Sequence, residues 1–173
     1  MMNILVAGAK GFVGKNLCTA LKNIQAGKDR THPTLTIGEI FEYDIDTDVT
    51  LLDNFCAKAD FVFHLAGVNR PQNQDEFMQG NFGFASTLLN TLKKYKNKAP
   101  IMLSSSIQAT LIGRYGTSDY GKSKLAGEEL FFEYGKSEGV KVAVYRFPNL
   151  MGHSRPKYNS AVSTFCWAVA NDQ

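Results

Sequence analysis

A glycine triplet that directly follows the first apolar segment places the strongest constraint on the fold. Residues 4–7, Ile-Leu-Val-Ala, are predicted to form a buried strand, and glycines follow at positions 8, 11 and 14 in GAKGFVG. Apolar residues then recur at helical spacing as far as Ile24. A strand, a glycine turn and a helix in immediate succession predict the opening unit of a parallel α/β sheet.

Strand-like and helix-like segments alternate along the rest of the chain. The remaining strands are predicted at 39–45, 61–67, 101–104 and 141–147. The helices are predicted at 12–24, 51–57, 75–96, 119–134 and 161–170, with an irregular connection at 25–38. This order predicts an α/β fold with a doubly wound parallel sheet of the Rossmann type.

The glycine turn has the composition of a pyrophosphate-binding loop. A pyrophosphate needs backbone N–H groups without side chains in the way, and a helix N-terminus presents such groups together with a favourable dipole. Gly8 permits the tight turn, Gly11 lets the ligand approach, and Gly14 lets the helix pack closely on the strand. The sequence therefore predicts a dinucleotide site.

Charged residues near the second strand bear on the choice of dinucleotide. Asp44, with Asp46 as the other candidate, would accept hydrogen bonds from a ribose 2′-hydroxyl and repel a 2′-phosphate. Lys10, inside the glycine turn, favours the phosphate instead. Either NAD or NADP is compatible with this pattern, and Asp44 inclines the prediction towards NAD.

A tyrosine and a lysine four residues apart predict a redox site for an alcohol or a carbonyl group. Tyr120 and Lys124 share one face of the helix predicted at 119–134. The ammonium group should lower the pKa of the phenol from its ordinary value of about 10 and help it to exchange a proton. The serines at 104–106 end a central strand, where a hydroxyl can polarise a substrate oxygen.

The remaining composition excludes several other classes of function. Three cysteines without a CxxC spacing and three histidines without an HxxxH pattern predict a reducing compartment, hence the cytoplasm, and no metal site. The chain carries no apolar run of membrane-spanning length. Its net charge of +3 includes one lysine cluster at 93–98, which fits a solvated helix end and gives no reason to expect nucleic acid.

The motifs together resemble the extended short-chain dehydrogenase/reductases that act on nucleotide sugars. Within this family the chain is similar to the bacterial capsular-polysaccharide reductases of the CapF type, which reduce the C4 ketone of a UDP-linked 4-keto-6-deoxy amino sugar. The motifs that carry the resemblance are GAKGFVG, HLAGVNRP, SSSIQAT, YGKSKLAGE and RFPNLMG, followed by Tyr158, Asn159 and Ser160.

The resemblance implies roles for individual residues. The catalytic residues would be Ser106, with Ser105 as the neighbouring alternative, Tyr120 and Lys124. The cofactor would contact Gly8, Lys10, Gly11, Phe12, Val13, Gly14, Asp44, Leu65, Ala66, Gly67 and Lys124. The UDP-sugar would contact Asn69, Arg70, Ser106 and Asn149. The resemblance further implies a homodimer formed through the helices at 75–96 and 119–134, with Phe131 and Phe132 exposed in its seam.

Two features leave the domain organisation and the reaction open. The predicted helix at 161–170 is apolar on nearly every side and requires burial, and the chain ends three residues later. We therefore expect a dinucleotide domain over residues 1–150 and the start of a largely missing sugar-nucleotide lobe over 151–173.

A nucleotide-sugar epimerase and a non-catalytic dinucleotide-binding protein are the alternatives to a reductase. Ile107 and Gln108 stand where related dehydratases have an Asp-Glu pair, so dehydration is not expected.

Overall fold

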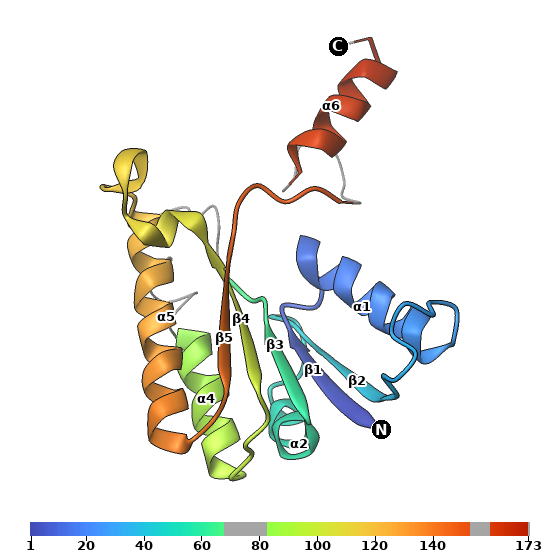
Figure 1. The fold of residues 1–173 in the computed structure, drawn as a ribbon, viewed down its shortest axis with the longest axis vertical. Helices are drawn as coiled ribbons and strands as arrows, with labels where there is room; N and C mark the ends of the chain where they lie inside the picture. The colour runs from blue at the N-terminus through green and yellow to red at the C-terminus, as the bar shows by residue number, and fades with distance from the viewer. Residues whose placement is uncertain (68–82, 153–159, 173) are drawn as a thin grey trace.

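Five parallel strands form one sheet in the computed structural model, which describes residues 1–67, 83–152 and 160–172 (Figure 1). The strands are β1 (Met2–Ala7), β2 (Ile37–Tyr43), β3 (Phe61–His64), β4 (Ile101–Ser106) and β5 (Val142–Phe147). The helices are α1 (Phe12–Gln25), α2 (Thr50–Lys58), α4 (Phe84–Lys94), α5 (Asp119–Glu138) and α6 (Ala161–Ala170), with short 3-10 turns η2 (Ile107–Thr110) and η3 (Gly113–Tyr115).

The order of the strands places a ligand crevice between β1 and β3. The sheet runs β2-β1-β3-β4-β5, and every neighbouring pair is parallel. From β1 the chain crosses towards β2 on one side, and from β3 it crosses towards β4 on the other. Ligands of open parallel sheets bind where this direction reverses, at the carboxyl ends of the strands. The predicted α/β fold with a doubly wound parallel sheet is confirmed.

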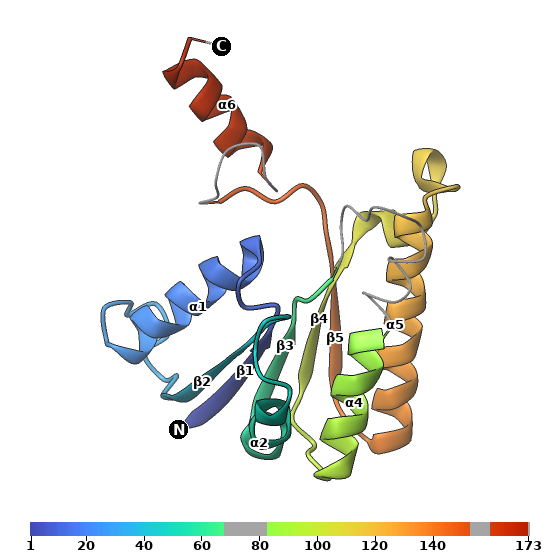
Figure 2. The ribbon, with the colours of Figure 1, turned by 180° about the vertical axis from the view of Figure 1, so that it is seen from behind.

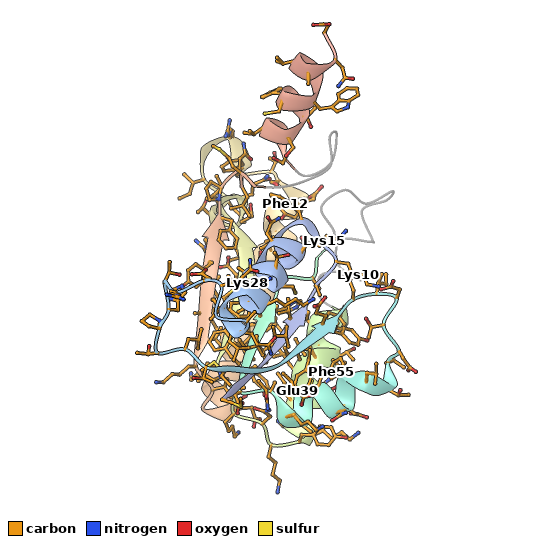
Figure 3. The ribbon with its side chains drawn as sticks, turned by 90° about the vertical axis from the view of Figure 1, so that its right-hand side faces the viewer. Lys10, Phe12, Lys15, Lys28, Glu39 and Phe55 are labelled. Atoms are coloured by element: carbon orange, nitrogen blue, oxygen red, sulfur yellow. The ribbon has the colours of Figure 1, made fainter. Side chains whose placement is uncertain are left out.

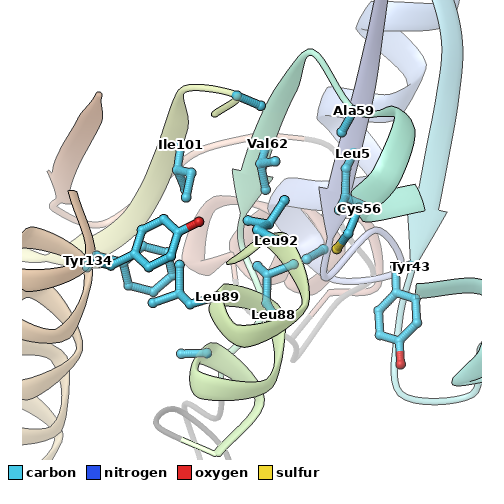
Figure 4. Close-up of a cluster of buried hydrophobic side chains, with 14 of the residues drawn as sticks. Leu5, Tyr43, Cys56, Ala59, Val62, Leu88, Leu89, Leu92, Ile101 and Tyr134 are labelled. Atoms are coloured by element: carbon cyan, nitrogen blue, oxygen red, sulfur yellow. The ribbon is translucent and has the colours of Figure 1, made fainter. Parts of the chain in front are cut away.

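Helices cover both faces of the sheet and define two hydrophobic cores. The strand β1 shows the division, since Leu5 faces the core beneath α2, α4 and α5, whereas Ile4 and Val6 face the core beneath α1. The larger core is shown in Figure 4, where Leu88 and Leu92 of α4 lie against side chains from the strands and from α2. Figure 2 shows the helices of this larger core in front of the sheet.

The predicted element boundaries differ from the observed ones near the carboxyl ends of the strands. We predicted the third strand to reach residue 67, but β3 ends at His64. His64 pairs with Ala7, the last residue of β1, and with Leu103 of β4, and beyond it β1 has already turned away at Gly8. The strand β4 is longer than predicted and includes all three serines, which pair with residues 145–147 of β5. Of the helix predicted over 75–96, residues 75–82 lie outside the described residues, and α4 accounts for the rest.

The structure bears on two expectations about apolar side chains, and the one for Phe131 is wrong. Residues 161–170 form the predicted helix, but none of them is buried, and Phe165 has 67% of its surface exposed. In Figures 1 and 2, α6 extends away from the sheet, so no layer of the sheet covers its apolar side chains. Phe131 is fully buried in the larger core because it faces inward from α5, whereas its neighbour Phe132 is 51% exposed.

The described residues contain no helix that is long and apolar enough to span a membrane. Within the same ranges, no three side chains of His, Cys, Asp or Glu lie close enough together to hold a metal ion.

Candidate functional site

A pocket of about 990 Å3 opens at the carboxyl end of the sheet. Its wall is built from the glycine turn after β1, residues just after β3, the end of β4, the first turns of α5, the residues after β5, and the start of α6. The predicted site residues that line it are Gly8, Gly11, Phe12, Val13, Gly14, Leu65, Gly67, Ser106, Tyr120, Lys124 and Asn149. The pocket therefore brings together motifs that lie more than a hundred residues apart in the chain.

The glycine turn packs so tightly that side chains would collide with the backbone at two of its three glycines. A Cβ atom on Gly8 would lie 2.5 Å from the backbone nitrogen of Ala66, and φ at Gly8 is +88°, which L residues rarely adopt. A Cβ atom on Gly14 would lie 2.1 Å from the carbonyl oxygen of Gly8. At Gly11, which lines the pocket, a Cβ atom would lie 3.3 Å from the carbonyl oxygen of Gly8, a tight contact but not an overlap.

The helix α1 begins at the glycine turn without a side-chain cap. Gly11 occupies the N-cap position, and no acidic side chain lies in the first helical turn. Helical N–H groups without an intrahelical partner attract anions, and the helix dipole reinforces this attraction. Phe12 lies at this end of α1 (Figure 3). The turn thus has the form required to hold a pyrophosphate.

Asp44 ties the end of β2 to the glycine turn. Its Oδ2 atom accepts a hydrogen bond from the backbone N–H of Lys10 at 2.7 Å, and its Oδ1 atom accepts one from Ile45 at 2.9 Å. The ammonium group of Lys10 pairs with Asp46 and lowers the pKa of that carboxyl. Neither Lys10 nor Asp44 lines the pocket, and their predicted contacts with the cofactor stay predictions.

Ser106, Tyr120 and Lys124 meet where β4 faces the start of α5. Ser106 and Tyr120 share a side-chain hydrogen bond. The Nζ atom of Lys124 lies 5.7 Å from the centre of the Tyr120 ring and donates a hydrogen bond to the carbonyl oxygen of Ser104 at 3.4 Å. The helix α5 packs closely on η2 at Gly121, where a Cβ atom would lie only 2.4 Å from the carbonyl oxygen of Gln108.

Burial dominates the titration of this cluster. It raises the pKa of Tyr120, and the hydrogen bond with Ser106 lowers it by a smaller amount. We predicted that Lys124 would lower the pKa of Tyr120 below its ordinary value, and this prediction is wrong because burial of the phenol is the largest influence on its pKa and raises it. Burial also lowers the pKa of Lys124 to about 8, against an opposing influence of Glu128.

Three polar side chains of this region were not anticipated from the sequence. Glu128 is 2% exposed and pairs with Arg146, while the Nδ1 atom of His64 is buried without a hydrogen-bond partner among the described residues. Burial, and then the charge of Lys124, lower the pKa of His64 to about 3. A signal for Glu128 existed, because it follows Tyr120 and Lys124 at the same four-residue spacing.

Some predicted site residues lie outside the pocket wall or outside the described residues. Ala66 does not line the pocket, but its backbone faces Gly8 at the closest approach of the two loops. Asn69 and Arg70, predicted to contact the sugar, lie outside the described residues. The roles assigned to individual residues stay predictions.

Comparison with known proteins finds relatives of the kind that the sequence motifs resemble. The chain is 38% identical over 172 residues to the UDP-2-acetamido-2,6-beta-L-arabino-hexul-4-ose reductase of Pseudomonas aeruginosa, covering 99% of this chain and 42% of that protein. It is 43% identical to the crystal structure of the capsular polysaccharide assembling protein CapF from Staphylococcus aureus, with a TM-score of 0.77, again over 99% of this chain and 42% of the other.

More distant structures share the fold. The UDP-glucuronic acid 4-epimerase of Bacillus cereus, solved in complex with NAD, has a TM-score of 0.71 at 22% identity, over 99% of this chain and 65% of the epimerase. The chain thus spans less than half the length of the two relatives with higher identity. The family model described as the NAD dependent epimerase/dehydratase family matches residues 4–172. The chain belongs to the NAD dependent epimerase/dehydratase family.

Proposed function

We propose that this chain is the dinucleotide-binding part of an NAD(P)-dependent reductase that acts on the C4 ketone of a UDP-linked 6-deoxy amino sugar in surface polysaccharide synthesis. One observation carries the proposal: the glycine turn and the Ser106–Tyr120–Lys124 cluster line the same pocket. The relative from Pseudomonas aeruginosa, named as a reductase of a UDP-linked hexul-4-ose, supports the choice of substrate.

The glycine turn fits a dinucleotide. Side chains are excluded at Gly8 and Gly14 by backbone contacts, and Gly11 leaves the approach to the N-terminus of α1 open. In this proposal the turn binds the pyrophosphate, and Leu65 and Gly67, from the segment that packs against Gly8, also line the pocket. A reduced nicotinamide, when bound, supplies the hydride.

The proton for the reduced ketone would come from Tyr120. Burial raises the pKa of Tyr120 above its ordinary value of about 10, so the phenol carries at neutral pH the proton that a developing alkoxide would need. Ser106, already hydrogen-bonded to Tyr120, would hold the ketone oxygen beside the phenol. Lys124 would place a positive charge beneath the ring and favour the phenolate that remains.

NAD is the cofactor we propose. Asp44 lies at the end of β2 with both carboxylate oxygens turned to backbone N–H groups, and Asp46 adds a second negative charge. These two negative charges would repel a 2′-phosphate. Lys10 could attract such a phosphate only by breaking its ion pair with Asp46, which further favours NAD.

The rest of the sugar site would lie beyond the dinucleotide domain. We propose a dinucleotide domain over residues 1–150 and the beginning of a sugar-nucleotide lobe over 151–173. Asn149, near the end of the dinucleotide domain, lies in the pocket wall. Asn69 and Arg70 would contact the sugar, as the resemblance implies. A homodimer through α4 and α5 would place the exposed Phe132 in its seam. A cytoplasmic location stays a prediction from the cysteine content.

An epimerase is the second candidate, supported by the family to which the chain belongs. It would use the same three residues but would return the hydride to the sugar. A purely dinucleotide-binding role is disfavoured because both Tyr120 and Lys124 are present and lie together in the pocket.

Two measurements test the proposal. Calorimetry on the 173-residue chain should detect binding of NADH, and Gly11→Leu should abolish it by filling the approach to α1. In the protein extended to the length of its relatives, a UDP-linked 4-keto sugar should oxidise one equivalent of NADH per sugar. Tyr120→Phe should stop this reaction while leaving the affinity for NADH nearly unchanged.

The outcomes separate the candidates. A changed sugar configuration without net oxidation of NADH would identify an epimerase. Full turnover by Tyr120→Phe would exclude the proposed proton donor. Equal affinity of wild type and Gly11→Leu for NADH would exclude the glycine turn as the binding loop.

A further inference from the structure

A buried carboxylate of α5 lies next to the redox cluster and is hydrogen-bonded to two strands, β4 and β5. Glu128 of α5 is 2% exposed, and a carboxylate at such a depth is strongly unfavourable unless it is paired and hydrogen-bonded. Its Oε1 atom accepts a hydrogen bond from the hydroxyl of Ser105 in β4 at 2.5 Å. The guanidinium group of Arg146 in β5 donates to both carboxylate oxygens, at 2.6 to 3.1 Å.

The partners of Glu128 are themselves fixed by the sheet. Ser105 and Arg146 are direct neighbours in the parallel pairing of β4 with β5. Side chains of a strand alternate between its two faces, so these two point towards α5 together. The carboxylate therefore joins the two strands to the helix at one point.

The contact of Glu128 with β4 lies between the contacts that the two proposed catalytic residues of α5, Tyr120 and Lys124, make with the same strand. Lys124 donates to the carbonyl oxygen of Ser104, and Tyr120 shares a hydrogen bond with Ser106. Ser105, the residue between these two serines, is the one that Glu128 holds. A shift of β4 along α5 would therefore change both contacts at once.

Glu128 also acts on Lys124 by its charge. The groups that face this ammonium are Tyr120 and Glu128 on α5, the neutral His64 on β3 and the carbonyl of Ser104 on β4. Among them Glu128 is the carboxylate, and it raises the pKa of Lys124 against the larger opposing influence of burial.

We propose that Glu128 is a positioning residue of the redox site, which through Ser105 and Arg146 holds the end of β4 in register with α5 and supplies the counter-charge for Lys124. This inference rests on the proposed function, in which Lys124 and Ser106 act on the nicotinamide and the ketone. It adds to that function a residue that does not line the pocket.

The test compares two glutamates that are adjacent in α5. Glu128→Gln keeps the size of the side chain and removes its charge, and Glu129→Gln makes the same change at an exposed position. In the 173-residue chain, NMR of 13C,15N-labelled lysine side chains would measure the pKa of Lys124, with its signal assigned through Lys124→Arg. We expect Glu128→Gln to lower this pKa relative to wild type and Glu129→Gln to leave it unchanged.

Kinetics in the protein extended to the length of its relatives supply the second readout. Glu128→Gln and Ser105→Ala should each lower kcat by tenfold or more, as misplaced catalytic groups do, while KM for NADH changes little. Ser105→Ala removes the contact with β4 but keeps the ion pair with Arg146, so it isolates the effect of register from that of charge.

Either of two results would overturn the inference. One is an unchanged Lys124 pKa in Glu128→Gln together with kcat equal to that of Glu129→Gln. The other is a loss of unfolding free energy in Glu128→Gln with kcat and the pKa of Lys124 unaltered, which would mean that the ion pair only stabilises the fold. The NMR titration needs no substrate, so failure of the proposed reaction would leave its result interpretable.

Discussion

The substitution Gly14→Ala tests the tightest packing around any of the described glycines. Gly14 is buried in the first turn of α1, and a Cβ atom there would lie 2.1 Å from the carbonyl oxygen of Gly8 and 2.7 Å from the backbone of Ala9. All of these atoms belong to the backbone, so no side-chain rotation can relieve the overlap. The turn or the helix must move.

The size of the effect follows from two opposing contributions. Overpacking in a rigid site costs about 1–3 kcal/mol, and a backbone neighbour places Gly14→Ala at or above the upper end of this range. Alanine in place of glycine within a helix recovers about 1 kcal/mol. We therefore expect Gly14→Ala to lower the free energy of unfolding by about 2 kcal/mol or more.

Gly127→Ala is the matched control, because it makes the same change inside α5 where a Cβ atom would meet nothing within 4 Å. There only the helical preference acts, and it should raise the free energy of unfolding by about 0.5–1 kcal/mol. Urea unfolding followed by circular dichroism would measure both variants, with equal m-values as the check that the same transition is compared.

The cofactor pocket adds a second comparison. At Gly11 a Cβ atom would lie 3.3 Å from the nearest atom, so Gly11→Ala should leave the free energy of unfolding within about 1 kcal/mol of wild type. If Gly14→Ala were as stable as Gly127→Ala, the close packing of α1 on the glycine turn would be refuted.

Three further predictions concern the core, the acid stability and the cofactor. Phe131→Ala should lower the free energy of unfolding by about 3–5 kcal/mol, and Phe132→Ala by less than about 1, as denaturant melts would show. Burial keeps the pKa of His64 at about 3, below its ordinary value of 6.5, so its contribution to stability is complete above pH 6.5 and is lost as the pH falls towards 3. Within that window the stability of wild type should fall more steeply than that of His64→Gln, by up to about 1.4 kcal/mol per pH unit, and parallel curves would contradict this. Calorimetry should show that Asp44→Ala lowers the dissociation constant for NADPH relative to that for NADH. Lys10→Ala should raise the dissociation constant for NADPH relative to that for NADH.

The sequence predicted most of the sheet because local periodicity and sheet topology agree. Buried strands such as 4–7 and the glycine turn that follows are short, contiguous signals. The end of β3 could not be predicted in the same way, since residues 65–67 are as apolar as a strand. The pairing of β3 with β4 ends at His64, although β4 itself continues to Ser106. Where this pairing stops depends on how β3 and β4, which are distant in the sequence, meet in the fold.

The errors at the site arise from burial, which a linear pattern does not specify. Phe131 and Phe132 are identical in type and adjacent in α5, yet one is buried and the other exposed. The pKa of Tyr120 depends on the balance between desolvation and nearby charge, and spacing alone reveals only the charge. The apolar character of α6 predicts a need for burial without identifying a partner.

The spacing of residues in β4 and α5 explains why three consecutive serines serve three different partners. A helix that links two parallel strands runs antiparallel to them, so Tyr120 lies nearest to Ser106 and Lys124 lies one turn further down. Four helical residues advance about 6 Å, and two strand residues advance about 6.6 Å, which matches Lys124 to the carbonyl of Ser104. Helical side chains tilt towards the N-terminus of their helix, and this tilt carries the carboxylate of Glu128 upward to Ser105. The repeat of four residues in α5 and the alternation of side chains in β4 thus make Glu128 part of the same geometry as the proposed catalytic residues.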